Sequence, residues 1–328
     1  MPQQGNHKIF STNPVSFGQE ALDIFNYQLN NNAVYRDFVQ ALGIRTQDVR
    51  EVKDIPFLPV RFFKTHPVVT GDFSPEAVFE SSGTTGMVSS RHLVRDVKLY
   101  EESFSRGFSV FYGDITDYCV IGLLPSYLER GHSSLVYMVD RLISQSGHPE
   151  SGFYLDEYAK LASVLQSLEE RGQPVLLIGV SFALLDFAEL YPMTLKHTII
   201  METGGMKGRR KELIRQELHA ILKSAFNQSS IHSEYGMTEL LSQAYSKGDG
   251  VYRCPPWMKV LLRDDEDPLH VMYTGTGVVN VIDLANIHSC SFIATDDAGK
   301  VYSDGSFEIL GRTDGSDMRG CSLLVVSQ

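Results

Sequence analysis

Three short clusters of polar and glycine residues have the types and spacing that phosphate chemistry requires. The first directly follows the extended segment 77–80, and its glycines allow a tight loop whose N–H and O–H groups point at phosphate oxygens. Its members are Ser81, Ser82, Gly83, Thr84, Thr85 and Gly86. The Gly-Lys-Ser/Thr ending of a Walker loop is absent, so the cluster does not indicate a P-loop nucleoside triphosphatase. Taken alone, the cluster is equally well explained as a plain turn.

Two further clusters each end a segment that we expect to be a strand. The second cluster is Glu202, Thr203, Gly204 and Gly205, whose glycines let a flat ring lie close to the backbone. The third cluster is Ser233, Glu234, Tyr235, Gly236, Met237, Thr238 and Glu239. It offers an aromatic ring for a base, a hydroxyl for phosphate and a carboxylate for Mg²⁺. Three clusters at consecutive ligand-facing positions predict a nucleotide site, although each alone is typical of a turn.

Two single residues are candidates for catalysis. Cys321 can accept an acyl group as a thiolate, and Arg319 can lower its pKa if the local chain is extended; a small buried residue is the alternative. His132 stands at a strand-to-helix transition, where it either lines a substrate pocket or makes ordinary hydrogen bonds at the helix end. The acidic runs 264–267 and 296–297 resemble metal ligands, but we expect solvated turns at both.

The elements that position these clusters alternate between strands and helices. Apolar runs predict strands at 117–125, 174–180 and 196–204, and a further short strand is expected at 230–236. Helical periodicity predicts helices at 133–145, 156–172 and 208–226, and another helix is expected at 181–192. In the helix at 208–226 the predicted apolar stripe is Ile214, Leu218, Ile221, Leu222 and Ala225. This alternation predicts an α/β fold with mainly parallel strands and ligands at their carboxyl ends.

The two ends of the chain differ from this middle part. The first 75 residues are predicted to be helical and loop-like, with an extended segment at 55–68 whose lysine and arginine we expect to be solvated. After residue 255, short β-rich runs are separated by Gly, Asp and Asn turn signals. We therefore predict an α/β core over 1–254 and a smaller β-rich subdomain over 255–328.

Composition limits the class of protein. The 328 residues are 43% hydrophobic and carry a net charge of −11, which predicts a folded protein without a nucleic-acid or anionic-membrane surface. No amino-terminal leader and no apolar run of 18 residues is present, so we expect a cytoplasmic protein. Its four cysteines include no Cys-x-x-Cys pair and predict neither a disulfide framework nor a zinc site.

Four motifs in the order of one family point to a resemblance. Ser81 to Gly86 looks like the phosphate loop of the adenylate-forming superfamily, which includes acyl-CoA synthetases, and Tyr235 to Glu239 matches its Tyr-Gly-Met-Thr-Glu motif. The segments 282–284 and 311–315 resemble its ribose-binding aspartate motif and its hinge motif. The resemblance implies the large domain of that superfamily, ATP as cosubstrate and Mg²⁺ as cofactor.

The resemblance also implies roles for individual residues. The hydroxyls of the first cluster would hold the β- and γ-phosphates, Thr238 the α-phosphate, and Glu239 the Mg²⁺. Tyr235 with the two glycines of the second cluster would enclose adenine. Asp283 and Arg312 would contact the ribose.

Within the superfamily the chain most resembles the acyl-protein synthetase family of the bacterial bioluminescence fatty-acid reductase complex, over nearly its whole length. That likeness implies activation of a fatty acid as acyl-AMP and transfer of the acyl group to Cys321, with a reductase as partner. Coenzyme A or a carrier protein is the alternative acceptor. A subunit that only binds adenine nucleotide is a further alternative.

Two departures from the superfamily pattern bear on catalysis. The lysine that usually follows the phosphate loop is absent, and either Arg91 or Mg²⁺ would have to serve in its place. The sequence given also stops 13 residues after Gly315, where superfamily members continue into a mobile lid that carries a catalytic lysine. Candidates to replace that lysine are Lys207, Arg209 and Arg210.

Overall fold

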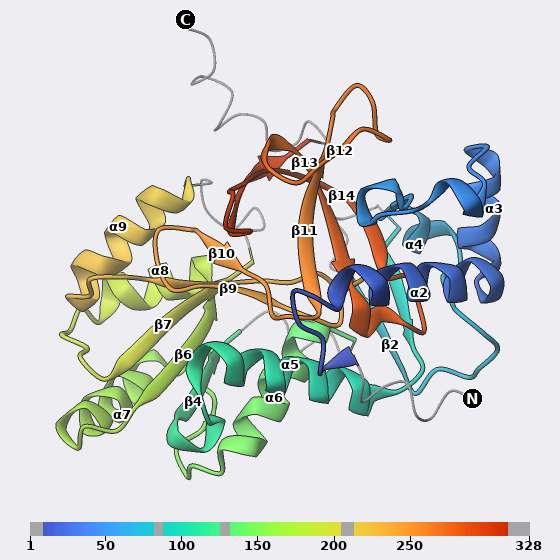
Figure 1. Cartoon of the computed structure of the whole chain (residues 1–328). Helices are drawn as coiled ribbons and strands as arrows, with labels where there is room; N and C mark the ends of the chain where they lie inside the picture. Colours follow the sequence, from blue (N-terminus) through green and yellow to red (C-terminus); the bar gives the residue numbers. More distant parts are fainter. Residues whose placement is uncertain (1–8, 82–87, 125–131, 205–212, 314–328) are drawn as a thin grey trace, which may run out of the picture. The chain divides into compact units, whose positions relative to one another are not determined.

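A computed structural model describes residues 9–81, 88–124, 132–204 and 213–313 of the chain (Figure 1). The chain divides into two units, and it passes between them more than once. The first unit takes the runs 1–103, 236–243 and 253–328, and the second takes 104–235 and 244–252. One boundary falls inside helix α5 (Val97–Tyr112), and another inside the two-residue strand β10 (Tyr252–Arg253).

The second unit contains the parallel sheet that the sequence predicts. Its strands are β4 (Cys119–Leu123), β5 (Gly152–Phe153), β6 (Val175–Val180), β7 (Thr198–Thr203), β8 (His232–Tyr235) and β9 (Ala244–Ser246). They lie in the order β9-β8-β7-β6-β4-β5, and only the pair β8 and β9 is antiparallel. Every residue of β4 and β6 is buried, as expected for a parallel sheet that is covered on both faces.

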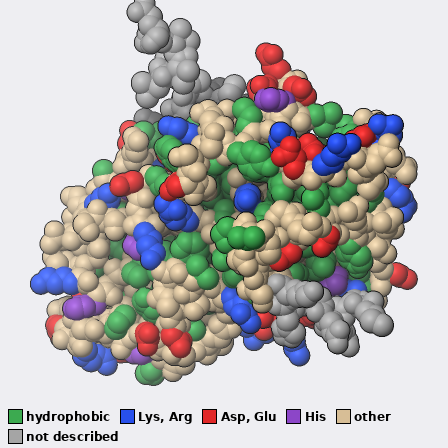
Figure 2. All heavy atoms as spheres, in the orientation of Figure 1, with side chains coloured by type: hydrophobic (Ala, Val, Ile, Leu, Met, Phe, Trp, Pro, Cys, Tyr) green, Lys and Arg blue, Asp and Glu red, His purple; other side chains and the backbone are tan. Residues whose placement is uncertain are grey.

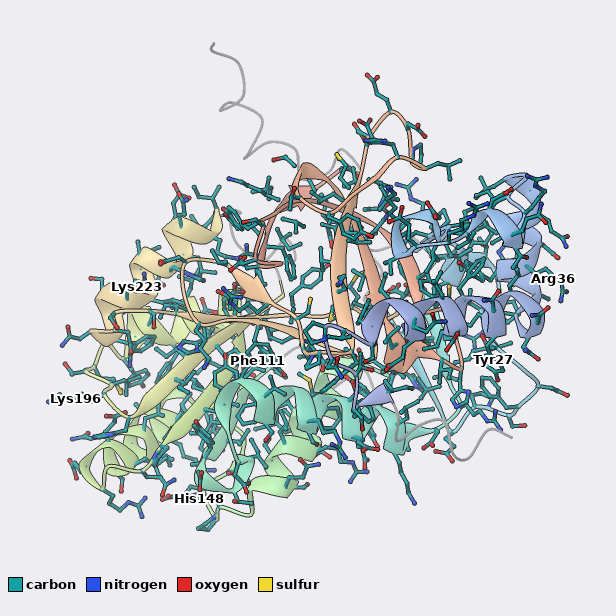
Figure 3. The ribbon with its side chains drawn as sticks, in the orientation of Figure 1. Tyr27, Arg36, Phe111, His148, Lys196 and Lys223 are labelled. Carbon is teal, nitrogen blue, oxygen red and sulfur yellow. The ribbon has the colours of Figure 1, made fainter. Side chains whose placement is uncertain are left out.

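Helices connect these strands. They are α6 (Ser134–Ser146), α7 (Tyr158–Glu170), α8 (Ser181–Leu190) and α9 (Arg215–Phe226), and Figure 1 shows α7 and α9 on opposite sides of β6 and β7. Side chains fill the space between the helices and the sheet (Figure 3), and Phe111 of α5 packs on Tyr245 with ring centroids 5.3 Å apart. The strand and helix alternation predicted from the sequence is confirmed.

Helix α9 differs from its prediction. Of the predicted range 208–226, residues 208–212 lie outside the described part, and residues 213 and 214 are not helical. The apolar stripe is also partly wrong, because Ile214 and Ile221 are 42% and 40% exposed. Leu218 and Leu222 are buried as predicted, together with His219 and Phe226.

The first unit contains an antiparallel sheet. Strands β11 (Met258–Arg263), β12 (Val271–Met272), β13 (Gly275–Asp283), β14 (Phe292–Val301) and β15 (Phe307–Arg312) lie in the order β12-β11-β13-β14-β15. The short η4 (Leu284–Asn286) follows β13. A separate hairpin pairs β2 (Ala77–Glu80) with β3 (Arg91–Val94). Strands β11 to β15 account for the β-rich runs predicted after residue 255.

Amino-terminal helices pack on the antiparallel sheet of the first unit. They are α2 (Phe17–Asn31) and α3 (Ala33–Ala41), followed by the 3₁₀ turns η1 (Thr46–Asp48) and η2 (Val52–Asp54). Gln28 of α2 donates hydrogen bonds to the carbonyls of Asn286 and Ser289, and Phe25 packs on Phe292. Burial of aromatic rings and satisfied amide groups fixes α2 to the sheet.

The segment 55–68 is only partly extended. Strand β1 (Leu58–Pro59) pairs in parallel with β14, and the chain then turns through the helix α4 (Phe62–Thr65). Arg61 is exposed, as expected, and its Nε also lies 3.1 Å from Oδ2 of Asp296. Lys64 is half-buried.

The exterior carries charges of both signs. Figure 2 shows Lys and Arg interspersed with Asp and Glu on the face in view, and acidic side chains gathered on the projecting turn between β11 and β12. Within the described residues, no helix is both long and apolar enough to cross a membrane. The predicted domain boundary at residue 254 stays a prediction. The two compact units follow a different grouping, in which residues 9–103 belong with residues 253–313.

Candidate functional site

In the first unit a chain of hydroxyls connects the start of the first cluster to Glu239. Ser81, the only residue of that cluster within the described part, accepts a 2.9 Å hydrogen bond from the N–H of Ser90, and the two hydroxyl oxygens are also 2.9 Å apart. The Ser90 hydroxyl donates a short hydrogen bond to Oε1 of Glu239. Since a hydroxyl has one proton, a Ser90 that donates to Glu239 can only accept from Ser81.

Glu239 is 5% exposed, and its environment is suited to a metal ligand. Burial raises the pKa of its carboxyl above the usual value, and the Ser90 hydrogen bond opposes that rise. The positive charges of Lys64 and Arg312 oppose it as well. Mg²⁺ in nucleotide enzymes is bound by one or two carboxylates plus substrate phosphates and waters, so one carboxylate beside hydroxyls fits this ion. The described residues contain no group of three acidic, histidine or cysteine ligands that would hold a metal without such a substrate.

The backbone of the Thr238–Glu239 segment is held by two side chains. His92 on β3 lies with Nδ1 2.9 Å from the carbonyl oxygen of Thr238, and burial lowers the pKa of His92 to about 4. The neutral ring must therefore carry its proton on Nδ1 to make this bond. Asn286 donates a 2.7 Å hydrogen bond from Nδ2 to the carbonyl of Glu239.

Asp283 anchors the residues that follow Glu239 in the chain. Its carboxylate, fully buried at the end of β13, accepts hydrogen bonds from the N–H groups of Leu241, Ser242 and Ala285 and from the Ser242 hydroxyl. These four bonds occupy the carboxylate oxygens in the described state. Asp283 thus positions the segment 239–242, and the ribose contact that the resemblance implies stays a prediction.

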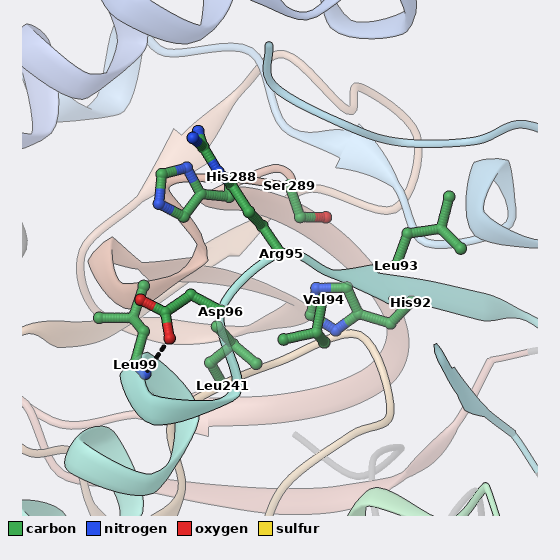
Figure 4. A pocket seen from close by; sticks show the side chains of 9 residues that line it. All are labelled: His92, Leu93, Val94, Arg95, Asp96, Leu99, Leu241, His288 and Ser289. Atoms are coloured by element: carbon green, nitrogen blue, oxygen red, sulfur yellow. Dashed lines mark hydrogen bonds between the residues drawn. The ribbon is translucent and has the colours of Figure 1, made fainter. Parts of the chain in front are cut away.

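A small pocket lies beside this segment (Figure 4). Its lining includes His92, Arg95, Leu241 and His288, and burial lowers the pKa of His288 to about 4. Asp96 at its rim accepts hydrogen bonds from the first N–H groups of α5, including that of Leu99 at 3.4 Å. His92, which lines this pocket, is also the residue whose Nδ1 contacts the carbonyl of Thr238.

Arg312, the predicted ribose contact of the hinge motif, is exposed at the end of β15. Its guanidinium lies 3.9 Å from Asp296 on the paired strand β14, which also binds Arg61. The sequence expectation of a solvated turn at 296–297 is therefore wrong, because both residues belong to β14. The turn expected at 264–267 is observed, with Asp264 accepting bonds from the N–H groups of Glu266 and Asp267.

In the second unit, Glu202 at the end of β7 belongs to a buried charge network. Its Oε1 lies 3.3 Å from Nε of Arg215 and 3.6 Å from Nε2 of His219. Burial alone would raise the pKa of Glu202, but the hydrogen bond from His219 and the charge of Arg215 hold the pKa below the usual value. Glu202 was predicted to lie in the adenine-binding cluster, and the structure gives its carboxylate two basic partners from α9.

Glu234 on the neighbouring strand β8 is a second buried carboxyl. It accepts a short hydrogen bond from the Thr203 hydroxyl, which lies opposite in the parallel register. Burial raises the pKa of Glu234 to about 7. The residue after it, Tyr235, is half-buried and packs edge-on against Tyr252 with ring centroids 6.0 Å apart.

Gly204 ends β7 in a backbone conformation that requires glycine. Its φ is +70°, and its carbonyl accepts a 2.6 Å hydrogen bond from the Ser181 hydroxyl at the start of α8. A side chain at this φ would be strained, so glycine is needed to end the strand in an exposed turn. This arrangement suits the flat-ring contact predicted for the second cluster.

The remaining residues of the predicted site include one beside a helix cap and others that are exposed or half-buried. His132 is exposed and precedes Ser133, whose hydroxyl accepts a hydrogen bond from Val136 N–H as the cap of α6. Gly236 is exposed, and Met237 and Thr238 are half-buried. The residues outside the described part are Ser82, Gly83, Thr84, Thr85, Gly86, Gly205, Lys207, Arg209, Arg210 and Cys321.

The three described cysteines are poor nucleophiles. Burial raises the pKa of the Cys119 thiol to about 11, and of the Cys254 and Cys290 thiols to about 12. A thiol with so high a pKa supplies almost no thiolate at neutral pH. Burial therefore disfavours the thiolate form of all three.

Comparison with solved structures defines the class of this fold. The chain has the α/β fold, with its mixed strands, of the large amino-terminal domain of adenylate-forming enzymes. No protein-family model and no curated protein matches the sequence.

Solved structures that the chain resembles include a CoA ligase and a luciferase-like enzyme. A 2-hydroxyisobutyryl-CoA ligase in its postadenylation state, with R3-HIB-AMP, matches with a TM-score of 0.60 and 10% identity over 95% of this chain and 69% of that one. ATP-bound MatB from Rhodopseudomonas palustris matches with a TM-score of 0.55 and 17% identity over 72% and 48%. The luciferase-like enzyme of the nonluminescent mealworm Zophobas morio matches with a TM-score of 0.51 and 16% identity over 74% and 59%.

These similarities define the fold alone, since every identity is below 20%. The chain spans about half of the length of the MatB structures that it matches. Membership of the acyl-protein synthetase family, the catalytic activity and the substrates are therefore matters for proposal.

Proposed function

We propose that this chain activates a carboxylic acid as an acyl-adenylate at the expense of ATP and passes the acyl group to a thiol. The observation that carries this proposal is the environment of Glu239. This residue ends a Tyr-Gly-Met-Thr-Glu motif on an adenylate-forming fold, it is buried, and Ser90 links it to Ser81 of the phosphate-loop-like cluster.

In the first step a carboxylate oxygen of the acid attacks the α-phosphorus of ATP. A new P–O bond forms, the bond to the β-phosphate bridging oxygen breaks, and pyrophosphate leaves with the electron pair. Such a displacement needs alignment and neutralisation of charge more than covalent help from the protein.

The residues of the chain have roles in alignment. Thr238 binds the α-phosphate, with its backbone fixed through His92, and the first cluster holds the β- and γ-phosphates. Gly204 and Tyr235 contact adenine, and Arg312 contacts the ribose. Glu239 would hold Mg²⁺, and the ion would supply positive charge against the phosphate oxygens. Ser90 orients the Glu239 carboxylate for this task.

In the second step a thiolate attacks the carbonyl carbon of the mixed anhydride, and AMP leaves with the electrons of the broken C–O bond. Sulfur is well suited to this step because thiolates are strong nucleophiles at neutral pH. The acceptor that the acyl-protein synthetase resemblance favours is Cys321, with a fatty acid as substrate and a reductase as the next partner. Coenzyme A or a carrier-protein thiol is the alternative acceptor.

Exchange of labelled pyrophosphate into ATP tests the first step. A panel of acids from acetate to myristate, with benzoate and amino acids, should give exchange with one class and so identify the substrate. ATP binding without exchange for any acid would instead support a nucleotide-binding subunit that depends on a partner for catalysis.

Covalent labelling by radioactive acid tests the second step. We expect C321S to lose labelling while it still forms acyl-AMP. The matched control is C254S, which removes a thiol that has a pKa of about 12 and should leave labelling unchanged. Labelling that persists in C321S would assign the acceptor role to another thiol.

A further inference from the structure

The ring of Tyr235, the predicted adenine contact, packs against a second tyrosine of the same unit. Tyr235 is half-buried at the end of β8, whereas Tyr252, the first residue of β10, is only 1% exposed. The two rings meet edge-on, with centroids 6.0 Å apart and an interplanar angle of 62°. Aromatic pairs favour this geometry, so the buried ring of Tyr252 limits how the ring of Tyr235 can tilt.

The chain returns to Tyr235 through a tight turn after β9. Tyr235 pairs with Ala244 in the antiparallel register of β8 and β9. In the turn, the Ser246 hydroxyl accepts a 3.2 Å hydrogen bond from the N–H of Gly248 and donates one of 2.8 Å to the carbonyl of the same residue. Gly250 has a φ of +70°, a conformation in which a side chain would be strained. The backbone that enters β10 is therefore well defined.

Arg215 of α9 packs on the ring of Tyr252. Its guanidinium carbon lies 5.3 Å from the ring centroid, within the range of a cation–π interaction. Nε of Arg215 lies 3.3 Å from Oε1 of Glu202. A Cβ atom at Gly250 would lie only 3.0 Å from Cδ of Arg215, so the absence of a side chain lets the turn approach this closely. Arg215 is thus held between a buried carboxylate, an aromatic ring and the turn.

Glu202 is held in turn by His219, in an arrangement that differs from a hydrolytic triad. Nε2 of His219 lies 3.6 Å from the Glu202 carboxylate and 3.4 Å from the Ser233 hydroxyl. In a catalytic triad the acid and the nucleophile bind different nitrogens of the imidazole, whereas here both face Nε2. Ser233 is also fully buried. The network is therefore suited to holding Arg215 and Tyr252 rather than to nucleophilic catalysis.

We propose that Tyr252 is a positioning residue for the adenine base. Tyr252 fixes the ring of Tyr235 in the orientation that contacts adenine, and Arg215 fixes the ring of Tyr252. The inference rests on the proposed function, in which Tyr235 contacts the base. A ring that is already oriented loses less conformational entropy when the base binds. Tyr252 and Arg215 therefore act on nucleotide affinity through Tyr235.

Calorimetric titration with AMP tests the proposal, because AMP carries the adenine base without the β- and γ-phosphates. Y252L removes the ring and should weaken AMP binding about fivefold, as expected for the loss of one aromatic pair. Y252F keeps the ring and should retain most of the affinity. R215M removes the guanidinium that packs on Tyr252 and should weaken AMP binding about threefold.

A double-mutant cycle with Y235L distinguishes positioning from a general loss of structure. If Tyr252 acts through the Tyr235 ring, Y252L should change AMP affinity by less than about twofold once Y235L has removed that ring. Thermal melting of each variant shows whether it is folded, and R215M takes the place of Y252L in the cycle if Y252L does not fold. The matched control is Y191L, which removes a ring of the same unit that stacks on Phe187 and should leave AMP affinity unchanged.

Additive effects of Y235L and Y252L, or an unchanged AMP affinity in Y252L, would overturn the role of Tyr252 while the proposed function stands. A loss in Y252F as large as that in Y252L would also overturn it, because the hydroxyl and not the ring would then be responsible. If the unaltered protein binds neither ATP nor AMP, the proposed function and the role of Tyr252 fall together.

Discussion

Oδ2 of Asp283, at the end of β13, accepts a 2.8 Å hydrogen bond from the backbone N–H of Leu241. The same oxygen accepts the N–H of Ser242, and the other oxygen accepts the Ser242 hydroxyl and the N–H of Ala285. A buried carboxylate thus holds Leu241 and Ser242, which follow shortly after Glu239. The position of Glu239, the metal ligand in the proposed reaction, therefore depends on a residue at the end of β13.

We expect D283N to destabilise the protein by about 2 kcal/mol, because the amide NH₂ must face at least one backbone donor without a hydrogen bond. Urea unfolding measures the change. D264N removes a charge from an exposed turn, where the carboxylate also accepts backbone N–H bonds, and should cost less than about 1 kcal/mol. Equal losses in the two variants would show that burial of Asp283 does not matter.

We expect replacement of the Glu239 carboxyl to preserve the stability of the protein but to reduce its activity. Because burial raises its pKa, the folded protein disfavours its charged form, and E239Q should be at least as stable as the unaltered protein. The glutamine keeps an oxygen for the Ser90 hydroxyl but loses the charge that holds Mg²⁺. Pyrophosphate exchange should fall roughly 100-fold.

S90A is the matched variant for this comparison. It keeps the carboxylate but removes its hydroxyl donor, so we expect a smaller loss of exchange and a loss of about 1 kcal/mol in stability. An E239Q protein with unchanged exchange would exclude Glu239 as the metal ligand.

The sequence predicts the second unit well because its signals are local. Strands β4, β6 and β7 are apolar runs that end at glycine or polar clusters, and helices α6 and α7 bury residues at the helical period. The error at Ile214 and Ile221 has a physical reason: apolar periodicity places residues on a stripe, but the partners that α9 packs against decide how wide that stripe is.

The support of the candidate site has no such local signal. Ser90, His92 and Asn286 contact Thr238 and Glu239 from distant parts of the chain, and nothing in their own neighbourhoods marks them. Lys64 was expected to be solvated but is half-buried, because a cation in an extended segment gives no sign of the neighbours that it acquires on folding. The pairing of β1 with β14, which places Lys64, is a tertiary feature.

The pair Glu202 and Arg215 should behave as a partly buried ion pair. R215M leaves the Glu202 carboxylate buried with only His219 and hydroxyl partners, and we expect a loss of about 2 kcal/mol, reduced by the 31% exposure of Arg215. In a double-mutant cycle with E202Q, the coupling energy should be about 1 kcal/mol.

Lys223 provides the control on the same helix (Figure 3). It lies 3.5 Å from the exposed carboxylate of Asp249, so K223M should cost less than about 0.5 kcal/mol. Additive effects of E202Q and R215M in urea unfolding would contradict the predicted coupling. If Glu202 contacts adenine in addition, E202Q will also lower ATP affinity in the folded protein.

Glu234 should make stability depend on pH near neutrality. Burial raises its pKa to about 7, while a glutamate in the unfolded chain titrates near about 4.3. Between these pH values the folded protein holds a proton that the unfolded chain has released. The contribution of Glu234 to stability is therefore complete below about pH 4.3 and is lost as the pH rises to about 7.

The E234Q variant isolates this contribution, because glutamine cannot titrate and still offers an oxygen to the Thr203 hydroxyl. Urea unfolding at pH 5 and pH 8 should show E234Q gaining about 2 kcal/mol relative to the unaltered protein over this interval. Buried His92, with a pKa of about 4, gives the free energy of unfolding an opposite slope against pH below about pH 6.5, but His92 is present in both proteins and its effect cancels.

T203V removes a hydrogen bond that lowers the Glu234 pKa, so the pH range over which stability is lost should move to higher pH. Parallel stability curves for E234Q and the unaltered protein from pH 5 to pH 8 would mean that Glu234 is already ionised in the folded state at pH 5.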